Sequence, residues 1–276
     1  MGFATGKIGV FDSGVGGLTV LNAIRERLPQ ESVLYFGDTA RLPYGTRSRH
    51  DIIQFVQEIL QWMEYEQVKL VVMACNTSSA LALHQVSSEF TVPILGMIDP
   101  AARAATAGGR RIGVIATPAT AASHAYKSAI TALAPDAQVW EVGCPAFVPL
   151  IEQNRIHHPE TRAVARDYLA PLLQQGIDTL VYGCTHYPLL DPVMKELLPP
   201  AVRRIDPAAQ VAIATARMLP LSLVSCHNQS LQTGSTRFCV SDCPDRFSEV
   251  ASQWLGYVPR VEQIVPSRYL SDLQLV

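Results

Sequence analysis

The sequence predicts an α/β protein made of two similar open parallel sheets of the flavodoxin-like kind, related by pseudo-symmetry. Short β-rich runs alternate with longer amphipathic stretches, and this order is typical of crossover units in a parallel sheet. An internal repeat divides the pattern into two halves. The composition supports a sizeable core, since 48% of the 276 residues are hydrophobic and only 17% are charged.

Six strands are expected in the first two thirds of the chain, and each is a nearly continuous apolar run with Val and Ile prominent. Such runs are typical of strands that are buried on both faces of a sheet. The expected strands are 7–11, 32–36, 69–73, 111–115, 138–142 and 178–182.

Four longer stretches place apolar residues three and four positions apart, which is the pattern of a helix with one face against a core. They lie between the expected strands, as crossover helices do. The expected helices are 18–28, 51–65, 120–133 and 160–175.

The C-terminal segment continues the alternation. It predicts a helix at 208–219, a strand at 236–240, a helix at 245–255 and a last strand at 260–264. Between them, 221–233 is rich in Ser, Gln and Asn, which is typical of a surface loop. Because nothing in this segment supplies a domain-sized core, we expect it to pack onto one of the two lobes.

The internal repeat consists of two pairs of segments. KIGVFDSGVGG (7–17) and RIGVIATPATA (111–121) each run from an Ile-Gly-Val strand into a small-residue loop. KLVVMACNTSS (69–79) and DTLVYGCTHYP (178–188) each follow an apolar strand with a small residue, a Cys and polar residues. The repeat predicts two similar α/β lobes, and chance similarity among Gly-Val-rich strands is the alternative.

Each lobe places one cysteine at the carboxyl end of a central strand. The distance along the chain from the Ile of the repeated strand is 67 residues for Cys75 and 72 residues for Cys184. We expect 1–97 and 207–276 to form a first lobe that carries Cys75. We expect 98–206 to form a second lobe that carries Cys184, with the active site between the lobes.

Charge and targeting signals exclude several classes of protein. Lys and Arg total 22 against 24 for Asp and Glu, and a net charge of −2 argues against binding to a nucleic-acid backbone. We expect neither a signal peptide nor a transmembrane helix, because no stretch approaches 18 apolar residues, and hence a cytoplasmic protein. In that reducing compartment disulfides are not expected among the six cysteines, which are Cys75, Cys144, Cys184, Cys226, Cys239 and Cys243.

Cys75 and Cys184 are the candidate reactive groups. A Cys at a helix N-terminus lies near unpaired N–H groups and the positive end of the helix dipole, which favour the thiolate. The alternative is a buried, inert thiol, for which the polar neighbours of the two cysteines would be unnecessary. Two thiols that face each other predict acid–base chemistry at one carbon, where one removes a proton and the other supplies one to the opposite face. The result is inversion of configuration, with no cofactor and no metal.

Five segments resemble those of a known family, in that family's order. They are FDSGVGGL, FGDTARLPYG, ACNTSSA, CPAFVPLIE and YGCTHYPLL. The family is the glutamate racemases of bacterial peptidoglycan synthesis, in the aspartate/glutamate racemase superfamily. The resemblance implies a cofactor-independent isomerase in which Cys75 deprotonates D-glutamate and Cys184 deprotonates L-glutamate.

The resemblance also implies which residues assist the thiols and bind the substrate. Asp12, Asp38 and His186 are implied to assist proton transfer. The matching substrate-binding positions are Asp12, Ser13, Tyr44, Gly45, Asn76, Thr77, Thr185 and His186.

Several of these residues have ordinary structural explanations as well. Asp12 could cap the following helix, Asp38 could form a turn, and His186 could be a hydrogen-bonded core or surface residue. We expect the backbone N–H groups of 13–17 to hold a carboxylate of the substrate. Glu152 matches a further family position, with a solvated helix residue as an equal alternative.

The remaining cysteines are expected to be packing residues. Cys239 and Cys243 form a C-x-x-x-C pair without a second pair nearby, which is a weak sign of a metal site. We expect both to be structural, together with Cys144 and Cys226.

Four rival functions are weighed against a glutamate racemase. A thiol oxidoreductase is disfavoured because the two cysteines lie 109 residues apart and no C-x-x-C occurs. A pyridoxal phosphate racemase needs a Schiff-base Lys, and none lies in a matched segment. A two-lobed binding protein would carry an export signal and has no use for paired thiols.

An aspartate racemase is the nearest rival, but it typically has an acidic residue where His186 stands, and pocket shape decides substrate length. We therefore expect glutamate as the small-molecule substrate, no nucleic-acid or membrane partner and, by resemblance alone, a homodimer.

Overall fold

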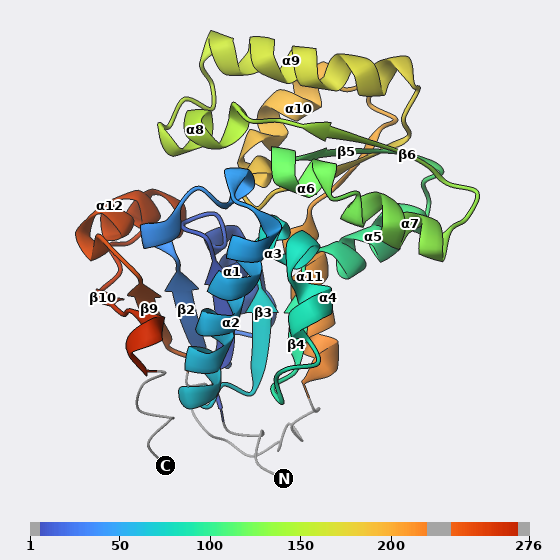
Figure 1. The fold of residues 1–276 in the computed structure, drawn as a ribbon. Coiled ribbons are helices and arrows are strands. Elements are labelled where there is room, and N and C mark those ends of the chain that lie inside the picture. The colour runs from blue at the N-terminus through green and yellow to red at the C-terminus, as the bar shows by residue number, and fades with distance from the viewer. Residues whose placement is uncertain (1–5, 220–232, 270–276) are drawn as a thin grey trace, which may run out of the picture.

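The computed structural model describes residues 6–219 and 233–269, which form two parallel sheets with helices on both faces (Figure 1). The strands are β1 (Ile8–Asp12), β2 (Val33–Gly37), β3 (Leu70–Met73), β4 (Ile94–Gly96), β5 (Arg111–Ala116), β6 (Gln138–Gly143), β7 (Thr179–Gly183), β8 (Arg203–Ile205), β9 (Thr236–Val240) and β10 (Val261–Gln263). The α-helices are α1 (Leu18–Arg27), α2 (Arg49–Tyr65), α3 (Asn76–Leu81), α4 (Leu83–Val86), α5 (Ile98–Thr106), α6 (Pro118–Ala122), α7 (Ala125–Leu133), α8 (Phe147–Glu152), α9 (Pro159–Gln174), α10 (Asp191–Leu197), α11 (Pro207–Met218) and α12 (Pro244–Leu255). Short 3-10 helices are η1 (Thr39–Arg41), η2 (Tyr44–Thr46), η3 (Tyr187–Leu190) and η4 (Pro266–Tyr269).

Both sheets are parallel throughout and repeat one strand order. The six-stranded sheet has the order β10-β9-β2-β1-β3-β4, and the four-stranded sheet has the order β6-β5-β7-β8. The order β2-β1-β3-β4 in the first sheet matches β6-β5-β7-β8 in the second, so β3 and β7 occupy equivalent positions. The prediction of two similar open parallel sheets is confirmed.

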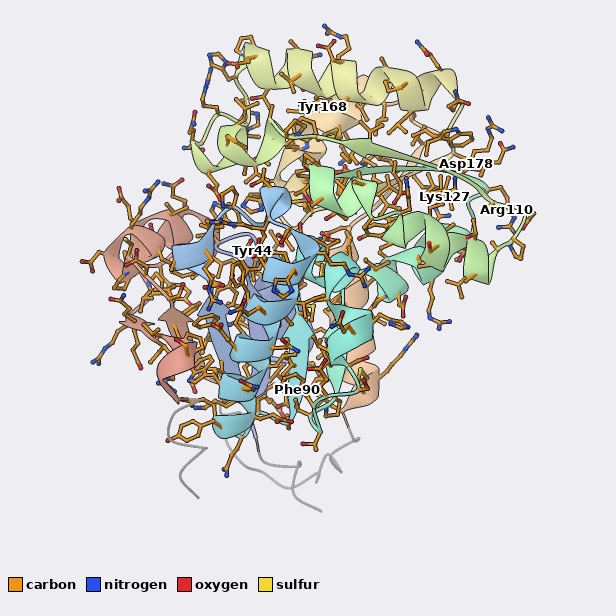
Figure 2. All side chains as sticks on the ribbon, viewed as in Figure 1. Tyr44, Phe90, Arg110, Lys127, Tyr168 and Asp178 are labelled. Atoms are coloured by element: carbon orange, nitrogen blue, oxygen red, sulfur yellow. The ribbon has the colours of Figure 1, made fainter. Side chains whose placement is uncertain are left out.

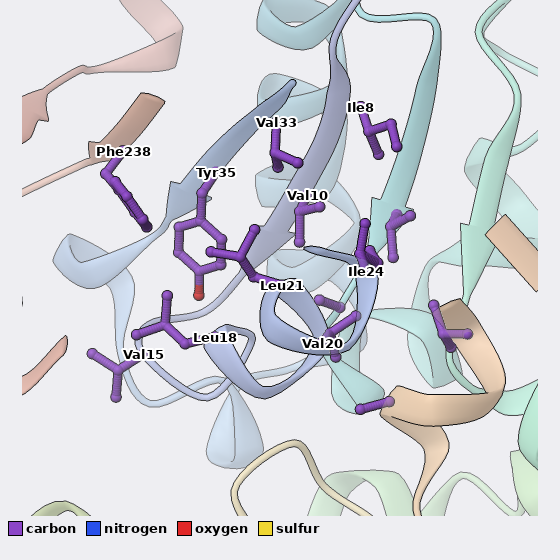
Figure 3. Close-up of a cluster of buried hydrophobic side chains, with 14 of the residues drawn as sticks. Ile8, Val10, Val15, Leu18, Val20, Leu21, Ile24, Val33, Tyr35 and Phe238 are labelled. Atoms are coloured by element: carbon purple, nitrogen blue, oxygen red, sulfur yellow. The ribbon is translucent and has the colours of Figure 1, made fainter. Parts of the chain in front are cut away.

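The six-stranded sheet is buried on both faces because successive residues of a strand point to opposite sides. Ile8 and Val10 of β1 join a cluster with Leu18 of α1 and with α11 and α12, part of which Figure 3 shows. Phe11 of the same strand joins a second cluster, which contains Ile52 and other residues of α2. This two-sided burial explains the continuous apolar runs in the sequence.

The four-stranded sheet repeats the arrangement. Val114 of β5 and Val181 of β7 pack against α5 and α7 on one face. Ile115 and Tyr182 pack against α8, α9 and α10 on the other face. In Figure 1 the arrowheads of β2 and β9 point toward this second sheet, so the first sheet turns its carboxyl edge to it.

The C-terminal segment packs onto the first sheet, as expected. Strand β9 pairs with β2 and β10 pairs with β9, both in parallel, and α11 and α12 join the cluster under α1. The predicted surface loop at 221–233 lies, except for its last residue, outside the described residues, as does Cys226.

The predicted strands agree with the observed ones to within one residue at each end. The predicted helix 120–133 is wrong as one element, because His124 adopts a left-handed conformation (φ 54°) between α6 and α7. Strands β4 and β8 were not predicted, since three residues carry too little hydrophobic pattern. Within the described ranges, no helix has the length and apolar character that crossing a membrane requires.

Candidate active site

A cavity of about 440 Å³ lies where the carboxyl ends of the two sheets approach each other. Segments that follow β1 and β3 line it from one side, and segments that follow β5, β6 and β7 line it from the other. The residues singled out from the sequence that line the cavity are Asp12, Ser13, Tyr44, Gly45, Cys75, Asn76, Thr77, Cys184, Thr185 and His186. Asp38 is the one that does not line it. Figure 2 shows Tyr44 near the boundary between the two lobes.

Cys75 follows β3 and caps the first turn of α3, where its sulfur accepts a hydrogen bond from the Ser78 N–H at 3.5 Å. Burial raises the pKa of the Cys75 thiol to about 12, the neighbouring Asp12 carboxylate adds to this, and hydrogen bonding from Ser78 offsets only part. The helix N-terminus therefore lowers the pKa of Cys75 as expected, but burial outweighs this effect, and the expectation of a thiolate is wrong for Cys75. Around neutral pH this residue is a thiol with a proton to give.

Cys184 follows β7 and has a different set of neighbours. It does not begin an α-helix, because it lies in a bend that is followed by a turn at 185–186 and then by η3. Its sulfur lies 3.7 Å from Nδ1 of His186, and Nε2 of His186 lies 3.0 Å from Oε1 of Glu152. Burial opposes a charge on this ring, but its hydrogen bonds with Cys184 and Glu152 raise the pKa of His186 to about 10. An imidazolium beside the Cys184 sulfur stabilises negative charge there.

Asp12 ends β1 and is almost completely buried. Its Oδ2 accepts from the N–H groups of Gly14 at 3.1 Å and Gly17 at 2.9 Å. Burial raises the pKa of this carboxyl, while the His186 charge and the loop N–H groups act in the other direction. The expectation that the 13–17 loop donates to a substrate carboxylate is wrong for these two glycines, because they hold a carboxylate of the chain itself.

Asp38 lies behind the cavity wall. Its Oδ2 accepts a hydrogen bond from the Tyr44 hydroxyl, and Nε of Arg41 lies 3.0 Å from the same oxygen. Burial and the Asp38 charge raise the pKa of Tyr44 well above its ordinary value. Tyr44 is therefore a neutral phenol whose ring Asp38 holds in place.

Contacts across the boundary join the two lobes beside the cavity. The Thr19 hydroxyl donates to the backbone oxygen of Thr185 at 3.0 Å, and the hydroxyls of Thr77 and Thr117 lie 2.9 Å apart. A Cβ on Gly16 would lie only 2.3 Å from Oγ1 of Thr185. The absence of a side chain at position 16 lets the two lobes approach this closely.

Sequence reasoning did not find the residues that reach the cavity through tertiary packing. Arg246 of α12 lines the cavity and is exposed, and it makes no hydrogen bond or ion pair with any described residue. Trp254 of the same helix packs edge to face on His186, with ring centroids 5.5 Å apart. Glu152, left open from the sequence, lines the cavity as well. No local pattern marks Arg246 and Trp254, because they belong to a helix far along the chain from the two cysteine loops, whereas Glu152 ends one of the family-like segments.

The other cysteines differ from one another. Cys144 and Cys239 are buried, as expected of packing residues, and Cys144 also lines the cavity. Cys243 is exposed at the start of α12, which contradicts the expectation that it packs in the core. In the part of the chain that the structure describes, no group of three or more His, Cys, Asp or Glu residues could hold a metal ion.

Comparison with known proteins assigns the family. The Asp/Glu/Hydantoin racemase family matches residues 9–216. A glutamate racemase of Gloeothece citriformis is 57% identical over 269 residues, which is 97% of this chain and 96% of that protein.

Two solved structures have the same fold along nearly the whole chain. A glutamate racemase isoform of Bacillus anthracis superposes with a TM-score of 0.88 at 35% identity, covering 95% of this chain and 98% of that one. A glutamate racemase of Francisella tularensis in complex with D-glutamate has a TM-score of 0.86 at 34% identity, with the same shares covered. The chain therefore belongs to the glutamate racemases of the Asp/Glu/Hydantoin racemase family.

Proposed function

We propose that this protein interconverts L- and D-glutamate by removing the α-proton with one cysteine and returning a proton with the other. The observation that carries the proposal is the placement of Cys75 and Cys184, which follow equivalent strands of the two sheets and line one cavity. Two thiols on opposite walls can serve the two faces of a planar carbanion. No cofactor enters this mechanism.

In the direction from L- to D-glutamate, Cys184 acts first as the base. Its sulfur takes the α-proton, and the electron pair of the broken C–H bond stays on the α-carbon. The Cys75 thiol then gives its proton to the opposite face, which leaves Cys75 as the thiolate. The reverse direction runs through the same steps, with Cys75 as the base.

The two sulfurs have different surroundings. His186, with its raised pKa, places a positive charge beside Cys184, while burial and Asp12 keep the proton on Cys75. A positive charge beside Cys184 favours proton removal by its sulfur, and the protonated Cys75 can supply the second proton. We propose that Asp12 and His186 assist proton transfer at Cys75 and Cys184, and that Asp38 acts through Tyr44.

The polar lining supports a small amino dicarboxylic acid as the substrate. We propose that the substrate is bound by Ser13, Tyr44, Gly45, Asn76, Thr77 and Thr185, together with Asp12 and His186. A carboxylate such as Asp12 suits an ammonium group, while hydroxyl and amide donors suit carboxylates. The relative from Francisella tularensis holds D-glutamate, which is consistent with this substrate.

We also propose the division into lobes and the cellular setting. Residues 1–97 with 207–276 form one lobe and 98–206 form the other, in keeping with which strands share a sheet. The free cysteines fit a cytoplasmic protein. Resemblance to the family supports a homodimer and the supply of D-glutamate for peptidoglycan.

The proposal is tested by incubating the protein with L-glutamate in heavy water without added cofactor. Optical rotation and deuterium at the α-carbon are followed for the wild type, Cys75→Ala and Cys184→Ala. The wild type is expected to form deuterated D-glutamate, and each variant is expected to lose racemisation by at least about a thousandfold. Cys243→Ala is the matched control, since this thiol is exposed and does not line the cavity.

Retained racemisation in both cavity variants would rule out the two-thiol mechanism. A clear preference of the wild type for aspartate would instead rule out the substrate and leave the chemistry intact.

A further inference from the structure

The side-chain amide of Asn76 is held on one side only. Its Oδ1 accepts a hydrogen bond of 2.6 Å from the hydroxyl of Tyr126, whereas its Nδ2 is buried and has no partner among the described residues. Asn76 is 2% exposed and Tyr126 is fully buried. A buried amine group without an acceptor is costly, so the free side of this amide needs an explanation.

The bond with Tyr126 fixes which way the amide faces. A phenol hydroxyl can donate or accept, but the Tyr126 hydroxyl has no other acceptor in the described chain. In the opposite orientation, Nδ2 would donate to Tyr126, the phenol hydrogen would have no acceptor, and Oδ1 would be unpaired. Burial and the charge of Cys184 also raise the pKa of Tyr126, so that the phenol remains a donor.

Asn76 is part of the cavity lining, and Nδ2 is the polar atom of its side chain that has no partner among the described residues. An amide N–H₂ offered there is a donor for a carboxylate, which would pair the orphan group on binding. An amide oxygen in the same place would repel that carboxylate.

We propose that Tyr126 is a positioning residue that holds the Asn76 amide with its N–H₂ group toward a carboxylate of the bound amino acid. The proposal rests on the proposed function, because it takes glutamate as the occupant of the cavity. Tyr126 itself does not line the cavity and acts only through Asn76.

The hydrogen bond between Tyr126 and Asn76 also makes substrate binding depend on the contact between the two lobes. Tyr126 belongs to α7, which covers the four-stranded sheet, while Asn76 begins α3 beside the six-stranded sheet. Next to it, the hydroxyl of Thr77 lies 2.9 Å from that of Thr117 and 3.2 Å from that of Thr120. The amide is therefore oriented for the substrate only while α3 and α7 are in contact.

The test compares Tyr126→Phe, Asn76→Ala and the double variant, with KM and kcat for both glutamate enantiomers. Phe keeps the ring and removes the hydroxyl, so KM is expected to rise about fivefold to tenfold while kcat changes less than about twofold. Asn76→Ala is expected to raise KM further. Adding Tyr126→Phe to Asn76→Ala is expected to change nothing more, because the hydroxyl acts through this amide.

Tyr182→Phe is the matched control. It also removes a buried phenol hydroxyl of the second lobe, which donates to Asp191 at 2.7 Å, but Tyr182 does not line the cavity. Its KM is expected to equal that of the wild type.

Asn76→Asp provides a second test that does not depend on the folding of Tyr126→Phe. It keeps an acceptor for Tyr126 and replaces the N–H₂ group by a charged oxygen, so KM is expected to rise by more than about a hundredfold, measured at equal folded fraction of variant and wild type.

Each contrary result has a distinct meaning. An unchanged KM in Tyr126→Phe or in Asn76→Asp, with an active wild type, would overturn the positioning role and leave the racemase function standing. The positioning role would also be overturned if Tyr126→Phe raised KM by the same factor in the wild type and in Asn76→Ala. A wild type that does not racemise glutamate would overturn the proposed function and this inference together.

Discussion

His186 shows how a single residue connects distant parts of the site. One ring nitrogen contacts Cys184 and the other contacts Glu152 of α8, so each N–H group of the protonated ring has a partner. Trp254 packs against the same ring from α12. The charge that stabilises the Cys184 sulfur is therefore set by neighbours from three different segments.

Glu152→Gln tests the role of that carboxylate. The amide oxygen can still accept from Nε2, but the negative charge is gone, so the pKa of His186 falls. We expect kcat/KM at pH 9 to fall roughly tenfold, with a smaller loss at pH 7. The measurement is the pH profile of racemisation, and parallel profiles for variant and wild type would contradict the role.

The alkaline limb of the wild-type profile is a second prediction at this scale. As the pH rises through about 10, His186 loses its proton and Cys184 loses its charge partner, so kcat/KM falls. L- and D-glutamate are mirror images of equal free energy, so kcat/KM must be the same in both directions at every pH. Racemisation is measured from each enantiomer between pH 7 and 11, and activity that still rises above pH 10 would contradict this assignment.

Among the elements, the loop before α1 has a strict packing requirement. The N–H groups of this loop donate to the Asp12 carboxylate. The loop also lies against the second lobe, where a Cβ on Gly16 would be 2.5 Å from Nδ1 of His186. Movement of one side chain cannot relieve this clash, because the same Cβ would lie 2.3 Å from Oγ1 of Thr185 as well. The two lobes and the His186 ring would have to move.

Gly16→Ala is therefore expected to lower kcat/KM by about a hundredfold, as small displacements of catalytic groups do. Gly14→Ala is the matched control in the same loop, because its Cβ would meet only the flexible end of Leu42, at 3.4 Å. Activity of both variants is compared at equal folded fraction, measured by circular dichroism. Similar activity in the two variants would refute the role of this close approach.

Helix α12 is the element whose contribution was least expected. It lies in the C-terminal segment, packs against α1 and still reaches the site, with Arg246 in the cavity lining and Trp254 on His186. Trp254 also packs against the core clusters of both lobes. The C-terminal segment thus completes the site as well as the sheet.

For the whole molecule, the buried thiols and His186 predict that stability falls as the pH rises. Burial raises the pKa of Cys75, Cys144 and Cys239, so the folded state keeps protons that an unfolded thiol loses above its pKa of about 8.5. Each thiol then lowers the free energy of unfolding by up to about 1.4 kcal/mol per pH unit. His186 acts with the same sign from about pH 6.5 up to its folded pKa of about 10.

Urea unfolding at pH 8, 9 and 10 measures this slope. Cys239→Ala removes one thiol that is remote from the cavity, so its slope above pH 9 is expected to be shallower than that of the wild type. A stability that does not change between pH 8 and 10 would contradict the burial of these groups.

Much of the fold could be predicted because its signals are local. The strands are runs such as 8–12 and 70–73, whose apolar residues fill both faces of a sheet. A similar run precedes each of the two cysteines, and this repeat predicts two lobes. The three-residue strands β4 and β8 could not be predicted, nor could the break at His124, because neighbours that are distant in sequence stabilise them.

The sequence by itself determined the two parallel sheets, the end of a central strand as the place of Cys75 and of Cys184, and the family to which their loops belong. These properties depend on hydrophobic periodicity and on short motifs, which neighbouring residues carry. Only the tertiary structure decided the charges and orientations in the site. It made Cys75 a thiol by burying it beside Asp12, charged His186 through Glu152 and turned the Asn76 amide through Tyr126. The physical reason is that desolvation and hydrogen bonding act through space, between segments that the chain order keeps far apart.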